Sequence, residues 1–204
     1  MKTRSKALLL TLCAVLLVAA SVLGTMAYLT STDSVENTFT VGSVAITLDE
    51  AKVNTDGTVV ANADRVKKND YKLMPGHTYT KDPTVHVAAG SENSWIFVKV
   101  ENGIFDYVYS GNRIEDQITR ENDGWTALHG ASNVYYKEYT KSESVTDLVV
   151  FSNFKIDDEA DKMAGWGDLT DAKVIVTAYA VQKDGFDTAI DAWNATFGKP
   201  AANP

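Results

Sequence analysis

Residues 172–182, AKVIVTAYAVQ, decide the fold class of this chain. Successive side chains of a β-strand point to opposite faces, and this stretch carries apolar side chains on both faces. One face would hold Val174, Val176, Ala178 and Ala180, and the other Ile175, Thr177, Tyr179 and Val181. Apolar residues on both faces predict a central strand that is covered on both sides for part of its length.

The same period of two recurs earlier in the chain. Residues 94–102, SWIFVKVEN, predict a second central strand, with Ile96, Val98 and Val100 on one face and Trp95, Phe97 and Lys99 on the other. Three more segments rich in Val, Ile, Phe and Thr predict strands: 39–48 (FTVGSVAITL), 83–89 (PTVHVAA) and 144–156 (SVTDLVVFSNFKI). Turn residues lie between them at Asp56-Gly57, Pro75-Gly76, Gly103, Asp123-Gly124 and Asp184-Gly185.

No segment alternates strands with helices of about 10–15 residues, the pattern that marks a parallel sheet. We therefore expect an all-β fold, an antiparallel β-sandwich of the jelly-roll type, over residues 42–198. A short C-terminal helix is predicted at residues 187–198, DTAIDAWNATFG, with Asp187 or Thr188 as its cap and Gly198 at its end. Its apolar face, which we expect to pack on the domain, is Ile190, Trp193 and Phe197.

The first 27 residues have the composition of a secretory signal peptide. Lys2, Arg4 and Lys6 precede an apolar run at residues 7–23, and the small residues that a signal peptidase reads follow in Thr25-Met26-Ala27. We expect cleavage between Ala27 and Tyr28, a separate N-terminal segment at residues 28–41, and a disordered tail at residues 199–204. The alternative is a retained membrane anchor, because the apolar run approaches the roughly 17–25 residues of a spanning helix.

Charge and cysteine usage exclude several classes of function. Removal of the leader would leave 16 Lys and Arg against 27 Asp and Glu, a formal charge of −11. Such an acidic chain repels phosphate backbones, which excludes nucleic acid as a partner. The only cysteine, Cys13, lies in the leader, so disulfides, zinc–thiolate sites and cysteine catalysis are not expected.

Motifs for catalysis or for cofactor binding are missing from the sequence. The three histidines, His77, His86 and His129, lack the His-Glu-x-x-His spacing that grips zinc on one helix face, and a site at His77 and His86 would be accidental. No Gly-x-Ser-x-Gly elbow or phosphate-binding glycine loop occurs. We expect no enzymatic activity, cofactor or metal site.

One acidic segment leaves calcium open as an alternative. It includes Asp157, Asp158, Glu159, Asp161 and Asp168. Carboxylates suit Ca²⁺, but the order of an EF-hand loop is absent, so a solvated surface loop is the simpler interpretation. The same residues, 157–168, are also a weak candidate for one helical turn.

Residues 27–50, AYLTSTDSVENTFTVGSVAITLDE, resemble the start of the mature chain in the TasA/camelysin family of secreted proteins from Gram-positive bacteria. The resemblance is most specific at residues 37–42, NTFTVG, and extends to residues 73–101 and 174–186. It implies a jelly-roll sandwich, a leader cut by a SipW-type signal peptidase, and a place in extracellular biofilm-matrix fibres or on the cell surface. The metallopeptidase activity described for some members is not expected here, because the zinc pattern is absent.

The resemblance also implies that residues 28–41 act as a donor strand, which adds to the sandwich of the next copy in a head-to-tail polymer. Val35, Phe39 and Val41 share one parity and would be its anchors. The alternative for this segment is a leader followed by a strand paired within its own subunit. Partners would be other copies of the chain, the signal peptidase during export, and other matrix proteins.

A second function remains open: a monomeric, secreted or surface-attached module that binds a glycan or a matrix protein through exposed aromatic residues. The candidates are Trp95, Tyr107, Tyr109, Trp125, Tyr135 and Tyr136. Each of them also suits a hydrophobic core. A secreted peptidase is a third reading, which the missing motifs disfavour.

Overall fold

The computed structural model describes Lys6 and residues 11–18, 43–120, 124–142 and 144–198. Lys6 and residues 11–18 are helical and belong to a unit separate from residues 43–198. Within this part of the chain, no helix has the length and apolarity needed to cross a membrane. The predicted segments at residues 28–41 and 199–204 lie outside the described residues.

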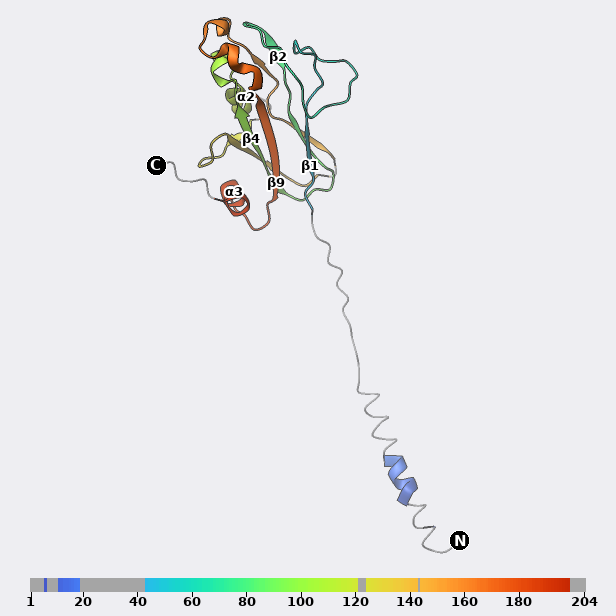
Figure 1. Ribbon diagram of the computed structural model, residues 1–204. Helices are drawn as coiled ribbons and strands as arrows, with labels where there is room; N and C mark the ends of the chain where they lie inside the picture. The colour runs from blue at the N-terminus through green and yellow to red at the C-terminus, as the bar shows by residue number, and fades with distance from the viewer. Residues whose placement is uncertain (1–5, 7–10, 19–42, 121–123, 143, 199–204) are drawn as a thin grey trace. The chain divides into compact units, whose positions relative to one another are not determined.

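Antiparallel strands form the regular structure of residues 43–198 (Figure 1). One sheet has the order β1-β3-β7, from β1 (Ile46–Asp49), β3 (Thr84–Val87) and β7 (Thr146–Val149). A second has the order β5-β6-β4-β9, from β5 (Thr126–Ala127), β6 (Val134–Tyr139), β4 (Ser94–Asn102) and β9 (Val174–Gln182). β2 (Thr78–Thr80) pairs with β8 (Asn153–Lys155). Every ladder is antiparallel, which confirms the predicted all-β, antiparallel class.

Short helices and 3₁₀ turns occupy some of the connections between the strands, and one helix, α3, follows the last strand. They are α2 (Ile114–Arg120), α3 (Ala189–Phe197) and the 3₁₀ turns η1 (Phe105–Tyr107), η2 (Ser110–Asn112), η3 (Ala160–Lys162) and η4 (Trp166–Asp171). The weak helical candidate at residues 157–168 therefore becomes two 3₁₀ turns, because η3 and η4 flank a left-handed Gly165 (φ 82°).

Side chains from two sheets meet in one core. Val85 and Val87 of β3 and Ile96 and Val98 of β4 are fully buried in the same cluster. Alternation along each strand puts these residues on one face, as the sequence predicted for β4. The first strand contributes Ile46, which packs against the same core.

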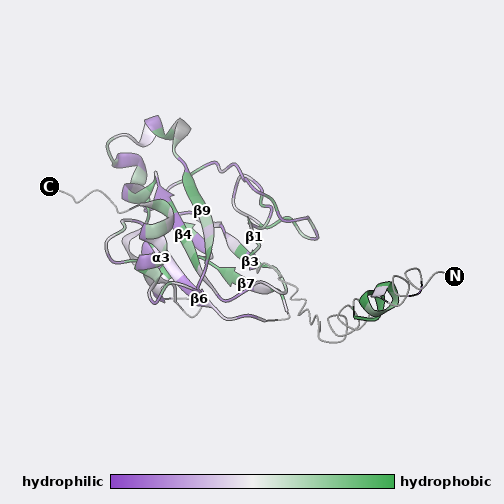
Figure 2. Ribbon diagram, turned by 90° about the horizontal axis from the view of Figure 1, so that it is seen from below, coloured by the Kyte–Doolittle hydropathy of each residue, from purple (hydrophilic) through white to green (hydrophobic). Residues whose placement is uncertain are grey.

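The opposite face of β4 is covered by α3 (Figure 2). Phe97 and Trp193 of α3 pack with ring centroids 5.2 Å apart, and Trp95 belongs to the same buried cluster. The predicted helix is confirmed: the Thr188 hydroxyl accepts the N–H of Asp191, and the chain leaves the helix at Gly198. β4 is therefore a central strand with both faces covered, as expected.

The prediction for residues 172–182 was wrong in one respect, because β9 is not a central strand. Among the described residues β9 pairs with β4 alone and forms the edge of its sheet. The core covers one face of β9, and the α3 cluster, with Tyr179 and Val181, covers part of the other. Apolar residues on both faces of a strand indicate that other elements cover the sheet above and below it. They do not indicate whether another strand pairs with each of its edges.

Candidate functional site

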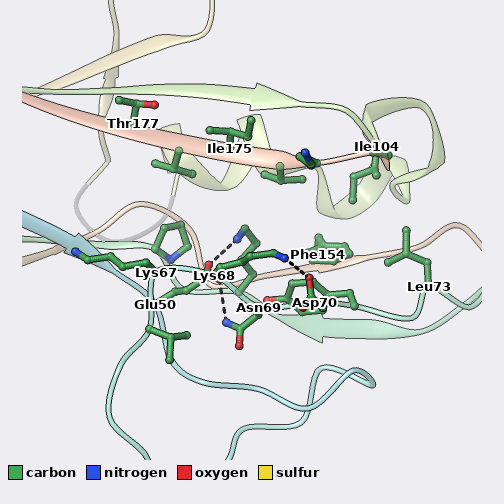
Figure 3. A pocket seen from close by; sticks show the side chains of 18 of the residues that line it. Glu50, Lys67, Lys68, Asn69, Asp70, Leu73, Ile104, Phe154, Ile175 and Thr177 are labelled. Carbon is green, nitrogen blue, oxygen red and sulfur yellow. Dashed lines mark hydrogen bonds and ion pairs between the residues drawn. The ribbon is translucent and has the colours of Figure 1, made fainter. Parts of the chain in front are cut away.

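A groove of about 1380 Å³ lies between β9 and the segment that follows β1 (Figure 3). Residues 174–178 of β9 form one wall, and residues 66–71 form part of the other. Ile175 and Thr177 lie on the first side in Figure 3, and Lys67 and Asn69 lie across from them. The groove therefore runs along the side of β9 that has no hydrogen-bonded strand in the described chain.

Hydrogen bonds at the two ends of β9 establish which backbone groups face the groove. Gly103 donates its N–H to the carbonyl of Lys173 (2.8 Å), and Lys183 donates its N–H to the carbonyl of Asn93 (2.7 Å). Both pairs continue the register of β4 and β9. Because hydrogen-bonded and non-hydrogen-bonded pairs alternate along an antiparallel ladder, the odd-numbered residues of β9 direct their N–H and C=O groups to β4.

The even-numbered residues of β9 direct their backbone groups the other way, toward the open edge. Within the groove these residues are Val174, Val176 and Ala178. Their side chains pack against the main core, so they are fixed in position. Three residues thus present a regular row of N–H and C=O groups, which is a template for pairing with another strand.

The edge of β1 is covered to a greater extent than the edge of β9. Glu50 and Val66 exchange two backbone hydrogen bonds of 2.9 and 2.8 Å. Two positions earlier along the same edge, the Leu48 carbonyl accepts a hydrogen bond from Lys67 Nζ. Of the two strand edges that border the groove, β9 is therefore the one open to an added strand.

The groove walls combine apolar side chains with paired charges. Ile104 and Phe154 are buried core residues that also reach the groove lining. Lys68 Nζ lies 2.8 Å from Asp70, an exposed pair, whereas Lys81 and Glu50 form a buried one. A strand edge beside apolar pockets suits an extended peptide, because backbone pairing supplies affinity and alternate side chains supply specificity.

The predicted cleavage and donor residues lie outside the part of the chain that the structure describes. They are Ala27, Tyr28, Val35, Phe39 and Val41. β1 begins at Ile46, five positions beyond the last of them. The structure thus describes a candidate acceptor for a strand, and the donor stays a prediction.

The histidines that the sequence singled out have separate partners. His77 Nε2 lies 2.8 Å from the carbonyl of Asp56, whereas His86 lies between Asp49 and Asp147. Among the residues that the structure describes, no group of three or more His, Cys, Asp or Glu side chains is placed to hold a metal ion.

The acidic segment that left calcium open uses several of its carboxylates within the chain. Asp158 pairs with Lys155 at 3.1 Å, and Glu159 pairs with Lys162 at 2.8 Å. The backbone N–H of Glu159 donates to Asp157 at 2.9 Å. These carboxylates point to neighbouring lysines and backbone, which agrees with a surface loop.

Half of the aromatic candidates for glycan binding are buried core residues. Trp95, Trp125 and Tyr135 are buried, and the Trp125 indole N–H donates to the carbonyl of Val149 at 2.9 Å. Tyr109 is the exposed member of the set, at 41%. Three of the six are thus unavailable to a ligand, because the sheets and the segments around them bury these rings.

Sequence reasoning missed the groove because its residues are distant along the chain. They come from residues 48–50, 66–83, 104, 154 and 166–178. The one local signal was the apolar pattern of residues 172–182. It indicates that both faces of the strand are covered, but not which strands pair with its edges. No protein-family model, curated protein or solved structure matches this chain.

Proposed function

We propose that this chain is a secreted structural protein that assembles head to tail by strand exchange. In this proposal residues 28–41 of one copy pair with the open edge of β9 in the next copy. The observation that carries it is the row of outward backbone groups at Val174, Val176 and Ala178, beside a groove large enough for an extended segment. The domain that carries this edge would be a β-sandwich of the jelly-roll type.

The spacing of the donor residues matches what the groove requires. In an added strand, alternate side chains would continue the face of Val176 and Ala178, toward the core. Val35, Phe39 and Val41 are apolar and lie at odd-numbered positions, so their side chains would all point to the same face of the added strand. Polar residues of the other parity, such as Thr38 and Thr40, would face away from the core.

Strand exchange of this kind produces a filament. The donor lies at the N-terminus and the acceptor on the domain, so the contact joins two different surfaces and need not close into a ring. An extracellular matrix or the cell surface would be the location, with a SipW-type peptidase releasing the donor and other matrix proteins as further partners. The formal charge of −11 disfavours nucleic acid.

Proline substitution on β9 tests the acceptor directly. Proline lacks an N–H, and a sheet tolerates it on an edge strand where that N–H faces outward. The Ala178 N–H points to the groove, so Ala178→Pro should leave the β4 pairing intact and remove one donor of the open edge. Chain beginning at Tyr28 should form filaments visible by electron microscopy, and the A178P variant should remain monomeric with a preserved circular dichroism spectrum.

Two control substitutions make the result specific. Ala178→Val retains the N–H and should still form filaments. Thr177→Pro removes an N–H that faces β4 and a hydrogen bond of the ladder, and it should destabilise the domain itself. Filaments of A178P at the wild-type concentration would overturn β9 as acceptor, and a wild-type chain that stays monomeric would favour the monomeric binding module.

A further inference from the structure

Lys81, Glu50 and Asn69 meet on the inner wall of the groove. Lys81 Nζ lies 2.5 Å from Glu50 Oε2. Asn69 Nδ2 donates to the other oxygen, Oε1, at 2.9 Å, and Figure 3 shows Glu50 and Asn69 side by side. The side chains of Lys81 and Glu50 are only 11% and 7% exposed, which makes theirs the most buried ion pair in the described part of the chain. One carboxylate therefore bridges an amine and a carboxamide away from bulk water.

The Asn69 carboxamide is fixed at both of its ends. Its Oδ1 accepts the backbone N–H of Val53 at 2.9 Å, and its Nδ2 also donates to the carbonyl of Ala51 at 2.8 Å. A hydrogen bond to the carbonyl oxygen draws electron density from Cγ and would stabilise negative charge on Oδ1. The carboxamide is thus oriented and polarised, and it shares the Glu50 carboxylate with the Lys81 amine.

We propose that Lys81 and Asn69 form an intramolecular isopeptide bond, with Glu50 as the proton carrier. The Lys81 ammonium gives a proton to the Glu50 carboxylate, and the resulting amine attacks Cγ of Asn69 as the new N–C bond forms. The negative charge on Oδ1 is held by the Val53 N–H. Collapse breaks the Cγ–Nδ2 bond as Glu50 returns the proton to the departing nitrogen, and ammonia leaves. The Glu50 carboxylate then takes the second proton from the former Lys81 nitrogen, which leaves a neutral amide.

The surroundings favour this reaction over a permanent ion pair. Burial of two opposite charges is costly, and the proton transfer from Lys81 to Glu50 removes both charges at once. The ring of Tyr71 lies 6.0 Å from Lys81 Nζ, and the Tyr71 hydroxyl is held by the carbonyl of Thr80 at 3.0 Å. Ammonia has a way out, because Glu50, Asn69 and Lys81 all line the groove.

The bond would cross-link the groove wall at Asn69 to the segment that connects β2 to β3. Asn69 lies in the segment at residues 66–71, and Lys81 lies between β2 and β3. Closing a loop between two chain positions restricts the unfolded chain, as a disulfide does. Cys13, the only cysteine, lies far from this domain in sequence, so no disulfide can serve the same purpose within residues 42–198.

Peptide mapping of the full 204-residue chain, purified in detergent, tests the proposal. Trypsin cuts after lysine, so an unlinked chain yields residues 69–72, 73–81 and 82–99 as separate peptides. An isopeptide bond blocks the cut at Lys81 and joins residues 69–72 to residues 73–99 in one branched species, lighter by one ammonia. Ring closure at Asn102-Gly103 also loses ammonia, but it leaves residues 69–72 free.

Two conservative variants separate the chemistry from the folding. Lys81→Arg retains the positive charge beside Glu50 and should yield no branched species. Glu50→Gln retains the shape, lacks the proton acceptor and should also yield none. Recovery of residues 69–72 and 73–81 as separate peptides from folded wild-type protein would overturn the proposal, and branched species in E50Q would overturn the role of Glu50.

Discussion

Asp49 of β1 and His86 of β3 are in direct contact, with Oδ1 and Nε2 2.8 Å apart. The other nitrogen of His86, Nδ1, lies 2.6 Å from Asp147 of β7. One imidazole thus joins all three strands of the β1-β3-β7 sheet. Arg65 also contacts Asp49 and Asp82, so the carboxylate of Asp49 has a second cationic partner.

This contact predicts a pH-dependent stability. Burial acts to lower the pKa of His86, but the hydrogen bonds to Asp49 and Asp147 outweigh it and raise that pKa above its ordinary value. A raised pKa means that the imidazolium stabilises the folded state fully below the unfolded pKa of about 6.5. The contribution is lost as the pH rises through the folded pKa.

Thermal unfolding of wild type and His86→Gln as a function of pH measures the effect. Above the unfolded pKa of about 6.5, the melting temperature of wild type should fall more steeply with rising pH than that of the variant, because only wild type has the His86 proton to lose. Asp147→Asn should retain part of the slope, since Asp49 still faces the imidazole. Parallel curves for wild type and H86Q would contradict the prediction.

At acidic pH the same contact changes stability in the opposite direction, because stability falls as the pH is lowered. Burial acts to raise the pKa of Asp49, but hydrogen bonds from Arg65 and His86 outweigh it and lower that pKa. The stability that Asp49 contributes is therefore present above its unfolded pKa and is lost as the pH falls through the lower, folded pKa. Asp49→Asn should reduce the fall in melting temperature at acidic pH. An unchanged fall would exclude the Asp49 carboxylate as its source.

Gly57 is predicted to be the least replaceable of the turn glycines. Its φ is 82°, and a Cβ there would meet the Cα of Tyr79 at 2.7 Å. Gly90 has a similar φ of 78°, but nothing lies within 4 Å of its Cβ position. In urea unfolding, Gly90→Ala should cost about 1–2 kcal/mol for the left-handed backbone alone, and Gly57→Ala clearly more. Equal losses would mean that the backbone yields at Gly57.

Phe97 should be the residue that couples α3 to the sheet. It is fully buried and contacts the ring of Trp193, so Phe97→Ala should cost about 3–5 kcal/mol and change the fluorescence of Trp193. Phe197 on the same helix face is 42% exposed and is the matched control. A larger loss for Phe197→Ala than for F97A would place the coupling at the end of the helix instead.

The strands that the sequence predicted are those with strong alternation. β3, β4 and β9 fall in predicted segments, as does β1 apart from Asp49, and the two faces of β4 are as expected. The predicted segment 144–156 contains two strands, β7 and β8, and not one. β6 was missed because Lys137 and Glu138 interrupt the apolar pattern of its six residues. α2 was missed because seven residues are too few for helical periodicity to emerge.

The groove and the buried cluster of Glu50, Asn69 and Lys81 could not be predicted from the sequence, for a different reason. Glu50, Asn69 and Lys81 belong to no spaced motif, and only the fold places them around one carboxylate. The open edge of β9 depends on which strands pair, and long-range pairing leaves no local mark in the sequence. By contrast, the donor segment at residues 28–41 was predicted from sequence alone and has no described structure.

The proposed donor strand predicts which of its side chains face the core of the acceptor. Phe39 would face the acceptor core and Thr40 would face away, because neighbouring residues of a strand point to opposite sides. Burying a phenylalanine is worth about 1.5–3 kcal/mol, so Phe39→Asp should raise the concentration needed for filament formation about 10- to 100-fold or more. Thr40→Asp adds the same charge on the outward face and should have a much smaller effect. Sedimentation of chains beginning at Tyr28 measures both variants; if T40D is impaired as strongly as F39D, net charge rather than strand insertion controls assembly.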